Sequence, residues 1–394
     1  MSTRRRWHLS ALAAVAALVV AGCGGGTTDS PLATRVIAFG DSLTDIGAYT
    51  PATSVNGPGT GAPYFGGKFT TNSHTGYTVA SNTSTANIWV EWIAARLGVP
   101  ITPAMAGFGP DTPQTRVRCP AALTNAALAG SCTGYAQGGS RVSNPAGINN
   151  PNGTGLVGST PAPMTLPMTT QVADHLTRFT NFGSDDIVFV FGGNNDIFVQ
   201  LAAAGSGAIT PQVATTNVQT AATELANLVR NQILANGARR VAVMTLPDAS
   251  TAPQFAGSSV QAAQTRALVQ SLSAAFNATL LTALDGANVR IIDVRALNAA
   301  VLASPATYGL TNVTTPACGT PAWNPSGTSL LCNAAPAALF TASGAPNRNG
   351  LAAGASASTW LFADGVHPTT GGHRILADQV WNALKDFGWV PDNL

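Results

Sequence analysis

Short apolar runs alternate with longer helical patterns along this chain. Four runs, bounded by polar or glycine-rich residues, have the length and composition of buried strands: 36–39, 187–191, 241–244 and 289–292. Helical spacing of apolar residues, or a composition rich in Ala, Leu and Gln, predicts four helices: 87–97, 212–234, 259–284 and 372–386. This alternation indicates an α/β fold with a central parallel sheet that is covered by helices on both faces.

Three long stretches rich in Gly, Pro, Thr and Asn interrupt this pattern: 48–85, 100–170 and 303–359. None of them has an apolar periodicity of its own, so none is expected to build a separate core. We therefore predict long loop insertions in one domain that covers residues 35–394.

The N-terminus has the features of an export signal. A basic segment, Arg4–Arg6, precedes the apolar run 9–20, which is about half the roughly 20 residues that span a bilayer. Residues 1–22 are thus predicted as a signal peptide and residues 23–34 as a linker. The ending Val-Ala-Gly-Cys resembles the bacterial lipobox, which implies lipidation at Cys23, and several acyl chains would anchor the protein stably. The alternative is an ordinary secretory signal with a chance cysteine.

Either signal implies an exported protein, which is an outer-membrane lipoprotein or a secreted one. Gly24 after the cysteine resembles the outer-membrane sorting pattern. Contact with the membrane is expected only through the N-terminal lipid.

The low content of charged residues excludes one class of partner. Charged residues make up only 9% of the chain and the formal net charge is +2. No basic stripe is available to neutralise phosphates, so nucleic acid is excluded as a partner. Globular proteins average roughly 25% charged residues, so Thr, Ser, Asn, Gln and Gly must cover most of this surface.

Four cysteines follow the signal region, and export favours disulfides between them. Three connectivities are possible, and the close spacings favour Cys119–Cys132 and Cys318–Cys332. No CxxC pair occurs and no histidine lies near these cysteines, so no metal site is expected. No cofactor is predicted.

A candidate nucleophile follows the first predicted strand, in the segment Gly40-Asp41-Ser42-Leu43. Reacting groups of α/β enzymes lie beyond the carboxyl ends of parallel strands, and Gly40 allows the backbone to turn there. Ser42 is therefore a possible nucleophile. The tetrapeptide alone is weak evidence, because glycine-rich turns with serine are common.

The best candidate for a base is His367. Asp364 precedes it by three residues, so one turn can bring the carboxylate to Nδ1–H and leave Nε2 as the base. A plain surface turn is the alternative. His373 is a competing base without such a partner. His74 and His175 have no acidic residue at a telling spacing, although Asp174 adjoins His175.

Two glycine-containing segments offer hydrogen-bond donors for an oxyanion. The segment 192–196, Gly-Gly-Asn-Asn-Asp, follows the strand 187–191 and places an amide side chain at the sheet edge that Ser42 occupies. In the segment 135–140, Tyr-Ala-Gln-Gly-Gly-Ser, a glycine N–H can approach a ligand closely. Each segment alone is also typical of a tight turn.

Taken together, four blocks in this order resemble the GDSL, or SGNH, hydrolases: 40–43, 138–140, 193–196 and 364–367. The resemblance spans residues 35–386 and implies a three-layer α/β/α, flavodoxin-like fold.

The resemblance also assigns roles to individual residues. It implies Ser42 as nucleophile, His367 as base and then acid, and Asp364 as the residue that orients the histidine. The implied oxyanion hole consists of the Ser42 N–H, the Gly139 N–H and the Asn195 side-chain amide. Three further carboxylates are implied to hold the turns of the site: Asp41, Asp45 and Asp196.

The expected activity is that of a serine ester hydrolase that forms an acyl-enzyme on Ser42. A small-molecule or lipid ester is the expected substrate, and lipid or acyl esters are favoured for a membrane-anchored protein. The alternatives are a carbohydrate O-acetyl esterase, an acyltransferase, and a non-catalytic lipoprotein that binds carbohydrate or lipid. The insertions are expected to shape the substrate pocket, so the sequence leaves the substrate open, as it does the oligomeric state.

Overall fold

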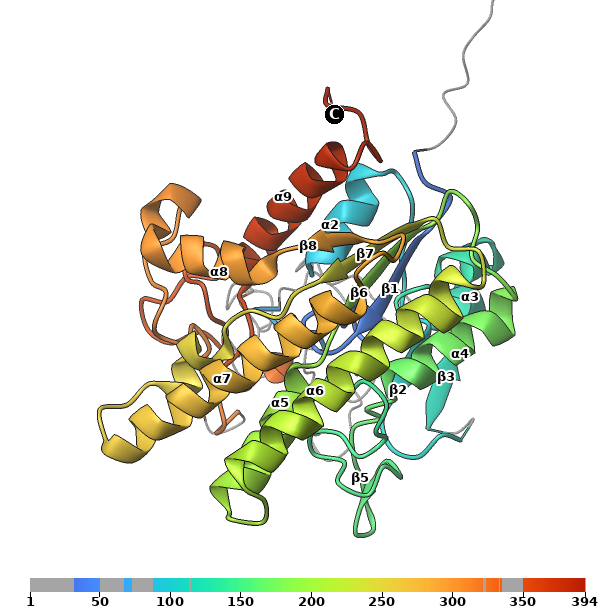
Figure 1. Cartoon of the computed structure of the whole chain (residues 1–394). Helices are drawn as coiled ribbons and strands as arrows, with labels where there is room; N and C mark the ends of the chain where they lie inside the picture. Colours follow the sequence, from blue (N-terminus) through green and yellow to red (C-terminus); the bar gives the residue numbers. More distant parts are fainter. Residues whose placement is uncertain are drawn as a thin grey trace, which may run out of the picture. The chain divides into compact units, whose positions relative to one another are not determined.

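A four-stranded parallel sheet forms the centre of the structure, a computed structural model (Figure 1). Its strands are β1 (Val36–Gly40), β6 (Ile187–Phe191), β7 (Arg240–Met244) and β8 (Arg290–Ile292), in the order β1-β6-β7-β8. Every residue of β1 and β6 is buried. This explains their continuous apolar sequences, because both faces of the sheet are covered. The predicted parallel α/β fold is confirmed.

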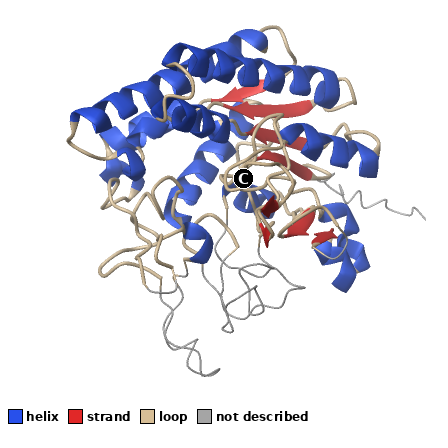
Figure 2. Ribbon diagram, turned by 90° about the horizontal axis from the view of Figure 1, so that it is seen from below, coloured by secondary structure: helices blue, strands red, loops and turns tan. Residues whose placement is uncertain are grey.

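Helices cover both faces of this sheet (Figures 1 and 2). On one face α6 (Pro211–Leu228) and α7 (Val260–Ala283) pack against each other, and on the other face α2 (Trp89–Arg96) packs against α9 (Thr370–Asp386). The Trp89 ring meets Phe189 of β6 edge-on, with 5.1 Å between the ring centroids. Aromatic packing of this kind fixes α2 on the sheet.

Three further helices were not predicted from the sequence: α4 (Met168–Phe179), α5 (Asn194–Gly205) and α8 (Val294–Ala303). The segment 192–196 is therefore more than a tight turn, because Asn194 begins α5. The predicted helix 212–234 is α6 followed by a π-helical turn, Val229–Leu234.

Short elements occupy the loop-rich stretches. Two antiparallel pairs are β2 (Met105–Gly107) with β3 (Arg116–Arg118), and β4 (Leu156–Val157) with β5 (Thr160–Pro161). The short helix α3 (Pro120–Thr124) lies in the same stretch. Single 3₁₀ turns complete the structure: Ala126–Ser131, Ala249–Thr251, Pro253–Phe255, Pro305–Tyr308 and Ser329–Leu331.

Two disulfides hold these stretches, Cys119–Cys132 and Cys318–Cys332, in the pairing that the spacings favour. Immediately after the first, residues 133–135 lie beside β1. The Ala38 N–H donates to the Thr133 carbonyl, at 3.0 Å, and the Tyr135 N–H donates to the Ala38 carbonyl, at 2.8 Å. This pairing directs the chain so that Gly138 and Gly139, which follow, lie near the end of β1.

The structure describes residues 32–49, 67–72, 88–112, 115–321, 324–332, 334 and 350–393. The predicted signal peptide 1–22, Cys23 and most of the linker lie outside the described residues, as does His74. Within the described ranges, no helix has both the length and the apolar character that crossing a bilayer requires. Residues Leu32–Leu394 form one compact unit.

Candidate active site

Ser42 lies directly beyond the end of β1. A side chain at Gly40 would place its Cβ 2.1 Å from the carbonyl oxygen of Phe191 in the neighbouring strand, so only glycine fits there. The Gln171 side chain holds Gly40 on both sides, because its Oε1 accepts from the Gly40 N–H and its Nε2 donates to the Gly40 carbonyl, both at 2.9 Å. Gln171 could not be predicted from the sequence, since nothing in the pattern links α4 to β1.

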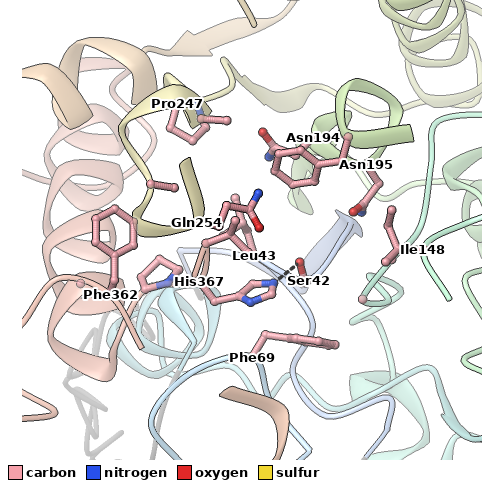
Figure 3. Close-up of a pocket in the computed structure, with 18 of the residues that line it drawn as sticks. Ser42, Leu43, Phe69, Ile148, Asn194, Asn195, Pro247, Gln254, Phe362 and His367 are labelled. Atoms are coloured by element: carbon pink, nitrogen blue, oxygen red, sulfur yellow. Dashed lines mark hydrogen bonds between the residues drawn. The ribbon is translucent and has the colours of Figure 1, made fainter. Parts of the chain in front are cut away.

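His367 and Asp364 come from one turn that precedes α9. His367 Nε2 lies 2.9 Å from Ser42 Oγ (Figure 3). On its other side, His367 Nδ1 lies 2.9 and 2.8 Å from the two carboxylate oxygens of Asp364. Burial opposes the charge on Asp364, but His367 and several hydrogen bonds outweigh it and hold the pKa of Asp364 well below its usual range. The site thus pairs an ionised acid with a histidine that faces a hydroxyl group.

Two backbone N–H groups of Asp364's own turn also hold its carboxylate, those of Val366 at 3.0 Å and His367 at 2.8 Å. A further N–H comes from Ser329, at 2.9 Å, in the insertion 303–359. Ser329 was not predicted from the sequence. A backbone donor carries no side-chain signal, so only the fold could reveal it.

The two predicted oxyanion donors lie at the same place. Gly139, with φ of 80°, lines the cavity beside Ser42, and so does Asn195 in the first turn of α5. Asn195 Nδ2 donates one hydrogen to the Ser140 carbonyl, at 2.8 Å, which orients the amide and leaves its second hydrogen. Among the described residues, none accepts a hydrogen bond from the N–H of Ser42 or Gly139. Ser42, Gly139 and Asn195 therefore line the same cavity, and each keeps an N–H hydrogen without an acceptor among the described residues.

The other predicted carboxylates hold the surrounding turns. Asp45 accepts from the N–H groups of Gly47, Ala48 and Gly138, at 2.9, 2.7 and 2.8 Å. Asp41 accepts from the Leu43 N–H at 3.1 Å. Burial raises the pKa of both carboxyls to about 6, against these hydrogen bonds.

Asp196 links α5 to the segment after Gly139. It accepts from Arg141 Nε at 2.9 Å and from the Val142 N–H at 3.0 Å. Burial raises the pKa of Asp196 although the Arg141 charge opposes the shift. Through these bonds the helix that carries Asn195 is tied to the loop that carries Gly139.

Phe69, in the described part of the insertion 48–85, covers the histidine. Its ring centroid lies 4.9 Å from that of His367. A Cβ at Gly138 would come within 2.1 Å of the Phe69 ring, so the glycine makes room for this contact. The insertion was predicted to shape the pocket, but the sequence carries no signal for the place of Phe69.

Among the described residues, neither of the other two histidines forms a hydrogen bond with Ser42. His175 and His373 are fully buried, and burial lowers the pKa of each to about 3. His175 Nδ1 lies 3.2 Å from the Tyr135 hydroxyl and its ring stacks on Phe182. Both histidines are neutral core residues at physiological pH. Within the described part of the chain, no cluster of His, Cys, Asp or Glu could hold a metal ion.

A cavity of about 910 Å³ extends from Ser42. This volume is near the upper end of the roughly 300–1,000 Å³ found for ligand sites. Its walls are mostly apolar and include side chains from α5, α8, the 3₁₀ turn before α7 and the loop before α9: Phe198, Leu201, Leu297, Val301, Phe255 and Phe362. The polar groups at Ser42 therefore face a largely hydrocarbon space.

Comparison with curated proteins found no match. The family model described as GDSL-like lipase/acylhydrolase matches residues 36–380, which is most of the chain. This match shows that the chain belongs to the GDSL-like lipase/acylhydrolase family and is a serine hydrolase that acts on ester bonds.

Proposed function

We propose that Ser42 is the nucleophile of this esterase and that its substrates carry an apolar acyl chain of medium to long length. Ser42 Oγ attacks the ester carbonyl carbon while His367 Nε2 takes the hydroxyl proton. The tetrahedral intermediate then collapses as His367 returns the proton to the leaving alcohol oxygen. Water attacks the acyl-Ser42 ester with His367 again as base, which releases the acid and restores Ser42.

Three donors stabilise the negative oxygen of each tetrahedral intermediate: the N–H groups of Ser42 and Gly139 and the amide of Asn195. Asp364 holds His367 in the tautomer that keeps a proton on Nδ1 and a lone pair on Nε2. The 2.9 Å distance from Nε2 to Ser42 Oγ supports these roles, because a base must reach the proton that it removes.

The apolar cavity is the observation that carries the choice of substrate. An acetyl group would leave most of about 910 Å³ unfilled, whereas each buried CH₂ contributes about 0.8 kcal/mol of binding. Carbohydrate would place hydroxyl groups against walls that offer few partners, and unpaired buried polar groups cost binding energy. Lipid or long acyl esters fit this site better than acetylated sugars.

A covalent probe tests the nucleophile. An alkyl fluorophosphonate should label the wild-type protein at one site, and Ser42→Ala should abolish both labelling and ester hydrolysis. Ser206→Ala, at an exposed serine after α5, is the matched control and should be labelled like the wild type. Hydrolysis by Ser42→Ala at the wild-type rate would refute the mechanism.

A chain-length series tests the substrate. Hydrolysis rates on p-nitrophenyl esters from acetyl to palmitoyl should rise with chain length to an optimum at or beyond octanoyl. Acetylated xylan and a phospholipid are measured alongside. A clear preference for acetyl esters and acetylated xylan would instead identify a carbohydrate O-acetyl esterase and overturn this choice.

We further propose that the protein is exported and lipidated at Cys23. The signal-like residues 1–22 support this proposal, and two disulfides suit an oxidising compartment. Membrane fractions of cells that express the full chain should contain a mature form with acylated Cys23, detected by mass spectrometry. Cys23→Ala should remain unprocessed; efficient cleavage of this variant would indicate an ordinary secretory signal.

A further inference from the structure

The carboxylate of Asp364 depends on a donor from outside its own turn. The Ser329 N–H reaches Asp364 Oδ2 at 2.9 Å, the same oxygen that lies 2.8 Å from His367 Nδ1. Both residues are buried, at 0% exposure for Ser329 and 8% for Asp364. A buried hydrogen bond to a charged group is stronger than a neutral one, so this contact contributes to the orientation of the carboxylate.

The disulfide Cys318–Cys332 brackets the segment that carries Ser329. At one end the Cys318 N–H donates to the carbonyl of Ala363, the residue before Asp364, at 2.8 Å. At the other end the Cys332 N–H donates to the Ser329 carbonyl at 3.0 Å. The covalent bond therefore links Cys318, which is hydrogen-bonded to the residue before Asp364, to the turn that supplies the donor.

The same segment also meets the other insertion and the cavity. The Gly67 N–H donates to the Leu330 carbonyl at 2.9 Å, and Asn72 Nδ2 donates to the Ser329 carbonyl at 3.0 Å. Leu330 lines the cavity, and Phe69 between these two donors lies against His367. Displacement of the bracketed segment would thus disturb the acid, the histidine and the cavity wall together.

We propose that the Cys318–Cys332 disulfide is a positioning element of the active site, which holds the Ser329 N–H on the catalytic carboxylate. This role rests on the proposed function of Asp364 and His367. Without the bond, the turn that carries Ser329 is held less firmly beside Asp364, and the carboxylate loses a donor and its fixed orientation. His367 is then held less firmly toward Ser42.

The chain offers a matched control for this role. Cys119–Cys132 closes a loop of nearly the same length, with a sequence separation of 13 against 14. No described residue of that loop lines the cavity at Ser42. Both disulfides should stabilise the fold by similar amounts, since the entropic contribution depends on loop length. Only the loop that Cys318–Cys332 closes contributes residues to the cavity wall.

The test compares Cys318→Ala/Cys332→Ala with Cys119→Ala/Cys132→Ala. Active sites are counted by fluorophosphonate titration, so that kcat is expressed per titrated serine. Loss of a hydrogen bond to a charged group changes an equilibrium or rate constant by roughly 10- to 100-fold. We expect kcat per titrated serine to fall by this factor in Cys318→Ala/Cys332→Ala and to stay at the wild-type value in Cys119→Ala/Cys132→Ala. Equal kcat in both variants, or fewer titrated serines with unchanged kcat, would show a purely structural role and overturn the proposal.

A second variant keeps both disulfides, in case the double variant does not fold. Ser329→Pro removes the N–H at the first position of a 3₁₀ turn, where proline is tolerated in helices. Ser329→Pro should lower kcat per titrated serine. The conservative variant Ser329→Ala should keep the wild-type kcat because its backbone N–H remains. Wild-type kcat in Ser329→Pro would overturn the proposal. Labelling of Ser42 is measured in every variant, so a failure of the proposed nucleophile is recognised separately.

Discussion

His367 Nε2 lies 2.9 Å from Ser42 Oγ, although 325 residues separate them in the chain. The serine follows the first strand and the histidine precedes the last helix, and the parallel sheet brings both to one edge. This contact joins two weak sequence signals into one chemically competent pair.

Asn195→Ala should lower kcat by about 10²–10³-fold, because one oxyanion donor is lost. KM should change little, since the amide acts mainly on the charged intermediate. Steady-state kinetics on a butyrate ester provide the measurement. Asn217→Ala, on the exposed face of α6, is the control and should behave like the wild type. Full activity of Asn195→Ala would exclude the donor role.

Asp364→Asn should lower kcat by up to about 10⁴-fold. The amide replaces one acceptor by a donor, which disfavours the tautomer of His367 that acts as base. Folding is followed by circular dichroism, so that inactivity is not mistaken for unfolding. Asp285→Asn, at an exposed carboxylate after α7, is the control and should retain the wild-type kcat. A loss of less than tenfold in Asp364→Asn would argue against an orienting role.

Val301→Phe should shorten the acyl-chain optimum. Val301 is 3% exposed on α8 and lines the cavity, so a larger ring occupies space that a long chain would fill. The ratio of kcat/KM for palmitoyl to butyryl ester should fall by about tenfold or more, the order of effect of excluded methylenes. Val213→Phe adds the same ring at an exposed site of α6 and should leave the ratio unchanged. An unaltered ratio in Val301→Phe would place the acyl chain elsewhere.

His373 should make the fold sensitive to acid. Its pKa is lowered to about 3 in the folded chain, against about 6.5 when unfolded, so the unfolded state binds the extra proton between these values. The free energy of unfolding therefore falls as pH drops from about 6.5 toward 3. Asp41 and Asp45 act in the opposite direction, because their raised pKa values favour the folded state at low pH.

The contribution of His373 is isolated by comparison with His373→Gln in urea denaturation at pH 7.5, 6 and 5. Between pH 6 and 5 the wild type should lose up to about 1.4 kcal/mol per pH unit more than the variant. A difference between the two proteins in the free energy of unfolding at pH 7.5, where the histidine is uncharged in both states, reports packing alone. Identical pH dependence in the two proteins would mean that His373 is not buried as a neutral group.

The sheet was predictable from the sequence because its strands are buried on both faces. A run of five apolar residues such as 187–191 is typical of a strand that is buried on both faces of a parallel sheet. The helices α4, α5 and α8 were missed, although Met168, Val172 and Leu176 recur at intervals of four in α4. These helices have only 10 or 12 residues. The helices α5 and α8 begin shortly after a strand, and α4 begins inside the predicted loop stretch 100–170.

The candidate site divides in the same way. Local sequence patterns indicate which groups are available: a serine after a strand, and an acid and a histidine three residues apart that one turn can bring together. The folded chain adds three contacts that no pattern indicates: the Ser329 N–H reaches Asp364, Gln171 holds Gly40, and Phe69 covers His367. Local patterns follow from backbone geometry within a few residues, whereas these contacts join segments far apart in sequence. Their positions depend on how the insertions close over the sheet, which no local periodicity records.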